Sequence, residues 1–327
     1  METSEFDSLL QQAKAARRDE PKSIRYEAVR GSGGGMLRYA VLPARPDGGD
    51  VPATPHGTVV FLPGRTEFIE KYIEDMRVVR GLGYAAAAMD LRGQGLSVRP
   101  GEDRGRHWID NFNHHVRDVR ALIRRLEAEG LPRPYIALAH SAGGHVVLRV
   151  LHDEPGLIDK AVLSAPMVGI ATGGLPAGFA KGLANFMHLL GLDHLYVPGH
   201  SAFREGAWGW RKQLTHDGER FRDEDHFIAE KEPALAVGGA TFGWVRAALR
   251  SCDRLNAPGF AEAIDVPVMI LRAGQDTIVD LGAMDRFAAR LPKGMVVPLE
   301  GAKHEILKET DDVRRQAWAA IREFLGC

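Results

Sequence analysis

Residues 135–146, YIALAHSAGGHV, join an apolar run to a helical pattern across one serine, and the architecture of the chain can be worked out from that junction. The apolar half is typical of a buried strand, and Gly143 and Gly144 open the helical half. A serine on a sharp turn from strand to helix is a candidate nucleophile, because the turn exposes its hydroxyl above the sheet. The alternative is that Ser141 only caps the helix. The turn needs a small residue two positions before the serine, and we expect Ala139 to be accepted there in place of glycine.

Short apolar runs alternate with helical patterns on both sides of this junction. Apolar strands separated by helices predict a mostly parallel sheet that is covered on both faces. Two further runs, joined by GSGGG at 31–35, predict an antiparallel hairpin rather than a phosphate loop, because the glycines lead into a strand and not into a helix. The expected strands are 24–29, 36–44, 57–63, 84–90, 135–140, 161–166, 266–274 and 294–301, and the expected helices are 67–81, 108–129, 143–154, 281–290 and 310–325.

The gap between the sixth and seventh expected strands is roughly a hundred residues long, far more than a crossover connection needs. We interpret this gap as a mainly helical insertion. The sequence therefore predicts an α/β core formed by 1–167 and 256–327, with a cap at 168–255.

A serine hydroxyl becomes a good nucleophile when a histidine accepts its proton and a carboxylate orients that histidine. Asp276 follows the expected strand 266–274, and His304 follows the expected strand 294–301. Both therefore lie at the carboxyl edge of the sheet, the same edge as Ser141. Asp90 is the main rival for the acid. Glu305 is a weaker rival, because a side chain adjacent to His304 points the wrong way to orient its ring.

The oxyanion of an acyl-transfer intermediate needs two backbone donors that are already in place. We expect one to be the N–H of Ala142, the residue after the nucleophile. The other is expected to be the N–H of Arg65, in the loop PGRTE at 63–67, where Gly64 allows the chain to turn. His140 and His145 flank the serine and are expected to pack around it, with His140 also a candidate substrate contact.

The composition excludes several other classes of protein. The formal net charge of the 327 residues is −1 at pH 7, so we expect no nucleic-acid partner. The two cysteines, Cys252 and Cys327, fit a reducing compartment, although a bridge between them is the alternative. With neither a signal-peptide pattern nor an apolar run near the ~20 residues of a membrane span, we expect a cytoplasmic protein. His114 and His115 lack further metal ligands nearby, so we expect no metal site.

The assembled motifs resemble the α/β-hydrolase superfamily, and within it the serine-lipase group that contains monoacylglycerol lipases and lysophospholipase L2. The resemblance implies Ser141 as nucleophile, His304 as base, Asp276 as acid, and the N–H groups of Arg65 and Ala142 as the oxyanion hole. It also implies that Asp90 belongs to a structural loop and pairs with Arg92. The motifs that carry the resemblance are PGRTEFIEKY at 63–72, MDLRGQGLS at 89–97, AHSAGG at 139–144, GGATFGW at 238–244, RAGQD at 272–276 and KHE at 303–305.

The resemblance predicts a cofactor-free ester hydrolase that works through an acyl-enzyme, with a single-chain lipid as substrate. PGR at 63–65 replaces the His-Gly of monoacylglycerol lipases, as in lysophospholipase L2, and the Arg65 side chain could meet a phosphate. Phe186, Met187 and Leu190 recur at helical spacing, either to pack the cap on the core or to contact an acyl chain or a membrane surface. The alternatives are a general carboxylesterase, an acyltransferase, or a binding protein on a hydrolase scaffold.

Overall fold

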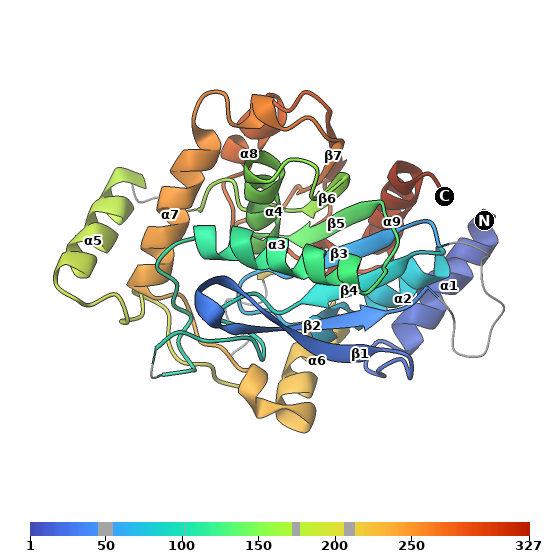
Figure 1. Cartoon of the computed structure of the whole chain (residues 1–327), viewed down its shortest axis with the longest axis horizontal. Helices are drawn as coiled ribbons and strands as arrows, with labels where there is room; N and C mark the ends of the chain where they lie inside the picture. Colours follow the sequence, from blue (N-terminus) through green and yellow to red (C-terminus); the bar gives the residue numbers. More distant parts are fainter. Residues whose placement is uncertain (45–54, 102, 172–176, 206–212) are drawn as a thin grey trace.

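A twisted sheet runs through the middle of the molecule (Figure 1). The computed structural model describes residues 1–44, 55–101, 103–171, 177–205 and 213–327. Strands β1 and β2 form the expected antiparallel hairpin, and β2 continues antiparallel against β4. All other neighbouring strands of the described sheet are parallel, which confirms the mostly parallel sheet. In spatial order the strands are β1 (Arg25–Arg30), β2 (Met36–Leu42), β4 (Ala85–Met89), β3 (Thr58–Leu62), β5 (Tyr135–His140), β6 (Lys160–Ser164), β7 (Val268–Ala273) and β8 (Gly294–Leu299).

Helices cover both faces of the sheet, because successive side chains of each central strand point to opposite sides. In β5, Ile136 and Leu138 face one core cluster while Ala137 and Ala139 face the other. Helices α1 (Thr3–Ala15), α2 (Ile73–Gly81) and α9 (Asp311–Leu325) pack on the first face. Helices α3 (Asn113–Ala128), α4 (Ala142–Asp153), α7 (Phe242–Asn256) and α8 (Leu281–Ala288) pack on the second.

The chain between β6 and β7 is mainly helical in its described parts. It contains α5 (Ala177–Leu189), α6 (Gly218–His226), which continues into a π-helical turn Phe227–Lys231, and α7. The buried side of α7, including Trp244 and Leu255, belongs to the same core cluster as the sheet. Helix α5 packs on α7 and lies at the outer edge of the molecule, at the left of Figure 1. The cap boundaries 168–255 remain a prediction, and 172–176 and 206–212 within them lie outside the described residues.

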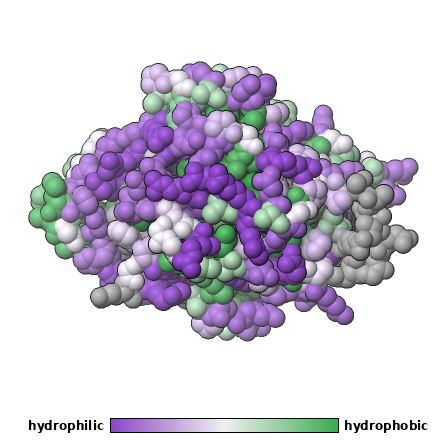
Figure 2. Space-filling view, viewed as in Figure 1, coloured by the Kyte–Doolittle hydropathy of each residue, from purple (hydrophilic) through white to green (hydrophobic). Residues whose placement is uncertain are grey.

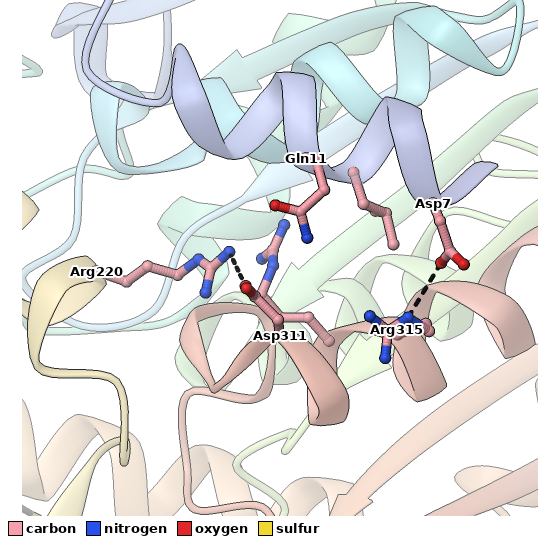
Figure 3. Close-up of a pocket in the computed structure, with 7 residues that line it drawn as sticks. Asp7, Gln11, Arg220, Asp311 and Arg315 are labelled. Carbon is pink, nitrogen blue, oxygen red and sulfur yellow. Dashed lines mark hydrogen bonds and ion pairs between the residues drawn. The ribbon is translucent and has the colours of Figure 1, made fainter. Parts of the chain in front are cut away.

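Helix α6 is fixed to the core by a buried arginine. The guanidinium of Arg220 contacts Glu74 of α2 at 2.8 Å, Asp311 of α9 at 2.8 Å and Asp217 at 2.7 Å. Figure 3 shows Arg220 reaching from α6 toward Asp311, in a small pocket that α1 also lines with Asp7. Because Arg220 and Glu74 are both almost completely buried, loss of either side chain would leave an uncompensated charge between α6 and the core.

Both cysteines are free, as their spacing suggests. Cys252 is buried in α7, and burial raises the pKa of its thiol to about 12. Cys327 is exposed at the end of the chain. Among the described helices, none combines the length and the apolar character that crossing a bilayer would require.

Candidate active site

Ser141 lies on a strained turn between β5 and α4. Its φ of 50° and ψ of −113° are rare for a residue with a side chain, and the fold imposes them by running strand directly into helix. The turn is tight because α4 approaches β3 closely: a Cβ on Gly143 would lie 2.3 Å from the carbonyl oxygen of Leu62. Ala139 is completely buried in the core on the strand side of the turn. The methyl group of Ala139 is therefore accommodated, whereas Gly143 leaves no room for one.

Ser141, His304 and Asp276 form one hydrogen-bonded chain. Ser141 Oγ lies 2.9 Å from His304 Nε2, and His304 Nδ1 lies 2.7 Å from Asp276 Oδ2. A carboxylate only accepts, so Nδ1 carries the proton and Nε2 is left to accept from the serine hydroxyl. All three residues are buried. These hydrogen bonds join residues from three separate loops at the carboxyl edge of the sheet, which is where the sequence analysis expects all three.

Asp276 is itself held in an ionised, oriented state. Its second oxygen accepts hydrogen bonds from the backbone N–H groups of Ile278 at 2.8 Å and Val279 at 3.2 Å. Burial alone would raise the pKa of Asp276, but the hydrogen bond and charge of His304 outweigh burial and lower the pKa below its ordinary value. Asp276 is thus a carboxylate at neutral pH, able to stabilise a positive charge on His304.

The backbone donors expected for an oxyanion follow β5 and β3, which are neighbouring parallel strands of the sheet. Ala142 is the first residue of α4, and Arg65 lies in the loop after β3. Within the described part of the chain, neither backbone N–H has a hydrogen-bond partner. Gln94 holds the Arg65 loop: it accepts from the Thr66 N–H at 3.1 Å and donates to the carbonyl of Gly64 at 2.7 Å. The loop is therefore held in place before any substrate arrives.

Asp90 has other partners than His304. Its carboxylate accepts from the backbone N–H groups of Ile69 at 2.9 Å and Leu96 at 2.8 Å, and pairs with Arg38 at 3.2 Å. Burial outweighs Arg38 and raises the pKa of Asp90 to about 6. The expected pairing of Asp90 with Arg92 is wrong, because the Asp90 carboxylate turns inward to bind backbone donors. Arg92 instead pairs with Asp118 of α3 at 2.8 Å.

Glu305 also turns away from the ring of His304. Its Oε1 lies 2.7 Å from the ammonium group of Lys71. His114 and His115 are a packed pair: His114 Nδ1 lies 2.8 Å from Ser32 Oγ, and buried His115 packs edge-on against Phe112. The described residues hold no cluster of three or more His, Cys, Asp or Glu side chains arranged to bind a metal.

Comparison with known proteins places this geometry in a family. The family model described as "Serine aminopeptidase, S33" matches residues 53–311. The chain belongs to this family of α/β-hydrolases. Lysophospholipase L2 of Escherichia coli strain K12 is 34% identical over 285 residues, which cover 82% of this chain and 80% of the relative. The probable lysophospholipase L2 of Haemophilus influenzae is 31% identical and covers 82% and 83%. A soluble variant of monoglyceride lipase from Saccharomyces cerevisiae shares the fold, with a TM-score of 0.70 at 20% identity over 93% of this chain and 94% of that chain.

The side chain of Arg65 places a positive charge near the candidate oxyanion loop. Its guanidinium lies 5.6 Å from the centre of a Trp244 ring and donates to the carbonyl of Gly238 at 3.3 Å. Burial lowers the pKa of Arg65 to about 10, and the more distant Glu224 does not offset that effect. No carboxylate in the described ranges forms an ion pair with Arg65, so its charge is available to another anion.

Several apolar side chains of α5 are exposed. The helix packs on α7, and within it Ala184 is buried and Met187 is partly buried. Phe186 is 55% exposed, and Leu190, just beyond the helix, is also 55% exposed. Figure 2 shows this end of the molecule as a hydrophobic patch at the left edge. Phe186 and Leu190 are thus too exposed to act mainly in packing the cap on the core, and their contact with an acyl chain or a membrane surface remains a prediction.

The two histidines beside the nucleophile have different surroundings. His145 is completely buried, with Nδ1 2.7 Å from the carbonyl of Met167 and Nε2 2.7 Å from Ser251 Oγ. His140 contacts Glu67 and the backbone of His304, so both of its nitrogens are occupied by protein. These contacts favour a positioning role for His140, and its contact with substrate remains a prediction.

Sequence reasoning missed Glu67 and Gln94 as parts of the site. Both stand in motifs that carry the resemblance, PGRTE and DLRGQG, but the sequence analysis gives neither of them a role. A buried glutamate two residues after a predicted oxyanion donor is the signal that could have identified Glu67.

Proposed function

We propose that this α/β-hydrolase is a serine carboxylic-ester hydrolase that removes the single acyl chain of a lysophospholipid. The observation that carries the proposal is the hydrogen-bonded chain Ser141–His304–Asp276, together with the backbone N–H groups of Ala142 and Arg65, which have no hydrogen-bond partner among the described residues. The names of the lysophospholipase L2 relatives support the substrate class.

The geometry is suited to acyl transfer in two steps. Ser141 Oγ attacks the ester carbonyl while His304 Nε2 accepts the hydroxyl proton, and Asp276 stabilises the resulting imidazolium. The N–H groups of Arg65 and Ala142 bind the oxyanion, a contribution of roughly 3 to 4 kcal/mol per donor. His304 then protonates the departing alcohol. A water molecule, deprotonated by His304, attacks the acyl-enzyme and releases the fatty acid.

The guanidinium of Arg65 supports the proposal that the substrate has a phosphate headgroup and not a neutral glycerol. A half-buried cation without a carboxylate partner among the described residues gains most from an anion that it can bind through two N–H groups. A monoacylglycerol offers no such charge. The preference for a lysophospholipid therefore depends on the side chain of Arg65, whereas ester cleavage uses its backbone N–H as an oxyanion donor.

The exposed face of α5 supports peripheral contact with a lipid surface. Phe179, Phe186 and Leu189 of this helix are 59%, 55% and 81% exposed. Apolar side chains on one amphipathic helix can enter the boundary between headgroups and acyl chains. We infer that α5 meets the surface from which the substrate is drawn. We also infer a cytoplasmic location, which the two free cysteines support.

The decisive experiment measures fatty-acid release from a lysophospholipid, a monoacylglycerol and a short-chain ester in parallel, with Ser141→Ala as the blank. Cleavage of the lysophospholipid at the highest kcat/KM, with an inactive blank, is the expected result. Turnover of the short ester alone would make the protein a general carboxylesterase. Acyl transfer to an added alcohol in preference to water would make it an acyltransferase. Activity in the Ser141→Ala blank would overturn the assignment of the nucleophile.

A further inference from the structure

A buried cluster of charged side chains lies beside the candidate triad and takes no part in the steps above. Glu67 is at its centre. One carboxylate oxygen of Glu67 accepts from the backbone N–H of Gly64 and from the hydroxyl of Tyr72, and its other oxygen lies 2.9 Å from the ammonium group of Lys71. Lys71 extends the cluster to Glu305. Because every one of these contacts donates to Glu67, its carboxyl group is ionised and acts only as an acceptor.

His140 connects this cluster to the base of the triad. Its Nδ1 lies 3.2 Å from the Glu67 carboxylate, and its Nε2 lies 3.2 Å from the backbone carbonyl oxygen of His304. Both partner oxygens are acceptors, so both hydrogen bonds form only when both ring nitrogens carry protons. The two histidine rings lie 4.7 Å apart between their centres. The geometry therefore requires a positively charged His140 next to the nucleophile.

Glu67 also reaches the oxyanion loop, because the Gly64 N–H that it accepts belongs to the residue before the Arg65 donor. One carboxylate thus connects the loop that carries an oxyanion donor, the residue before the nucleophile and, through His140, the backbone of the base. We propose that Glu67 holds His140 as an imidazolium and that this pair is a positioning unit, which fixes the His304 backbone relative to Ser141 and Arg65. This inference rests on the proposed function, since it assigns His304 as the base.

The charges around His140 agree with this state. Burial alone would lower the pKa of His140, but Glu67, with a smaller contribution from Glu305, outweighs burial and the opposing charge of Lys71 and raises it above its ordinary value. Other titratable groups also face the cluster. Glu224 lies 3.4 Å from the Lys71 ammonium group, the Lys308 ammonium group lies 5.7 Å from the centre of the Tyr72 ring, and the phenol of Tyr72 and the ring of His304 contact Glu67 and His140. Loss of the His140 proton at high pH would remove one of its two hydrogen bonds and loosen the His304 loop.

His145, on the other side of the nucleophile, provides an internal control. It donates from Nδ1 to a carbonyl and accepts at Nε2 from the Ser251 hydroxyl, which a neutral ring does with both nitrogens. Burial lowers the pKa of His145 to about 3. The two histidines that flank Ser141 should therefore differ in charge at neutral pH.

The first test is imidazole ¹⁵N NMR of the wild-type protein at pH 7, with signals assigned from His140→Gln and His145→Gln. The expected result is two protonated nitrogens on His140 and one on His145. A neutral His140 at pH 7 would overturn the proposal. This measurement needs no catalytic activity, so it is independent of whether the proposed function holds.

The second test compares Glu67→Gln with wild type on a soluble short-chain ester. We expect kcat to fall by about 10- to 100-fold, the scale of a catalytic group misplaced by up to 1 Å, with KM nearly unchanged. The alkaline decline of kcat should move to lower pH, and the His140 signals should become those of a neutral ring. His140→Gln combined with Glu67→Gln should cost no more than either alone, because the two act as one unit.

Glu70→Gln is the matched control, since Glu70 is a buried glutamate three residues further along the chain that pairs with Arg38 and not with His140. We expect it to retain the wild-type pH profile. A Glu67→Gln variant that folds and keeps the wild-type kcat and the wild-type decline of kcat at alkaline pH would contradict the proposal. Losses of kcat that add up in the double variant would also contradict it. If Glu67→Gln does not fold, the wild-type NMR result still decides.

Discussion

A Cβ atom on Gly143 would lie 2.3 Å from the carbonyl oxygen of Leu62, so the backbones of α4 and β3 touch directly behind the nucleophile. Gly143→Ala should therefore push α4 outward and displace Ser141. We expect a loss of stability of about 1–3 kcal/mol or more, the usual cost of overpacking, and a large loss of turnover. Ala139→Gly, on the strand side of the same turn, is the matched control and should stay within a few-fold of wild type. Urea unfolding and ester hydrolysis measure both effects, and equal behaviour of the two variants would refute this account of the turn.

Asp276→Asn should lower kcat by orders of magnitude while leaving the fold intact. An amide can orient the His304 ring in the wrong tautomer and cannot stabilise its positive charge, and a comparable substitution in another triad costs about ten-thousand-fold. Steady-state kinetics on a short-chain ester, with circular dichroism as the folding control, tests this. Turnover close to wild type would transfer the role of the acid to another carboxylate.

Arg65→Ala keeps the backbone N–H and removes the guanidinium. We expect kcat/KM for a lysophospholipid to fall by about 10- to 100-fold, the equivalent of about 1.4 to 2.8 kcal/mol, with little change for a monoacylglycerol. Arg65→Lys should recover part of the loss, because it restores the positive charge but not the bidentate hydrogen bonding of a guanidinium. Parallel losses on both lipids would mean that the guanidinium shapes the loop and does not bind phosphate.

Phe186→Ser combined with Leu190→Ser should weaken binding to phospholipid vesicles and slow hydrolysis of vesicle-bound substrate, because each change removes exposed apolar surface. Hydrolysis of a soluble ester should be unaffected. The matched control is Met295→Ser, since Met295 is 42% exposed but lies on β8. Vesicle co-sedimentation of the wild type, the double variant and Met295→Ser measures this binding. If the double variant bound vesicles as well as the wild type, α5 would not be the membrane contact.

The buried ion pair of Glu74 and Arg220 should make the free energy of unfolding depend on pH in the acidic range. Burial alone would raise the pKa of Glu74, but Arg314 and Arg220 outweigh it and lower the pKa from 4.5 to about 2. Stability from this group is thus complete above about pH 4.5 and is lost as the pH falls toward 2. Glu74→Gln should cost about 3–5 kcal/mol at pH 7, and the gap to wild type should narrow below pH 4.5. Urea unfolding at pH 7, 4 and 3 measures this, and a gap that stays constant would contradict it.

Much of the fold could be predicted because its signals are local. The strands and helices follow from hydrophobic period and turn residues, and Asp276 and His304 could be chosen because each follows a strand of a parallel sheet. Pairings between distant parts of the chain could not be predicted in this way. Arg92 has Asp90 two residues away but pairs with Asp118, because the Asp90 carboxylate is occupied by backbone donors.

The same limit applies around the candidate site. Glu67 and His140 are 73 residues apart in sequence and meet only because β3 and β5 are neighbours in the sheet. Helix α7 lies almost wholly within the expected cap at 168–255, and its buried side packs in the main core. This contact could not be predicted, because contacts between elements depend on tertiary packing that sequence spacing does not show.

The two thiols of the chain differ so much in reactivity that the wild-type protein carries its own labelling position. A thiol must ionise to react, so Cys252, buried with a pKa of about 12, is inert to maleimide, whereas Cys327 is exposed. Figure 1 shows the C-terminus and α5 at opposite ends of the molecule. A fluorophore on Cys327 would therefore report tumbling and surface attachment without touching α5.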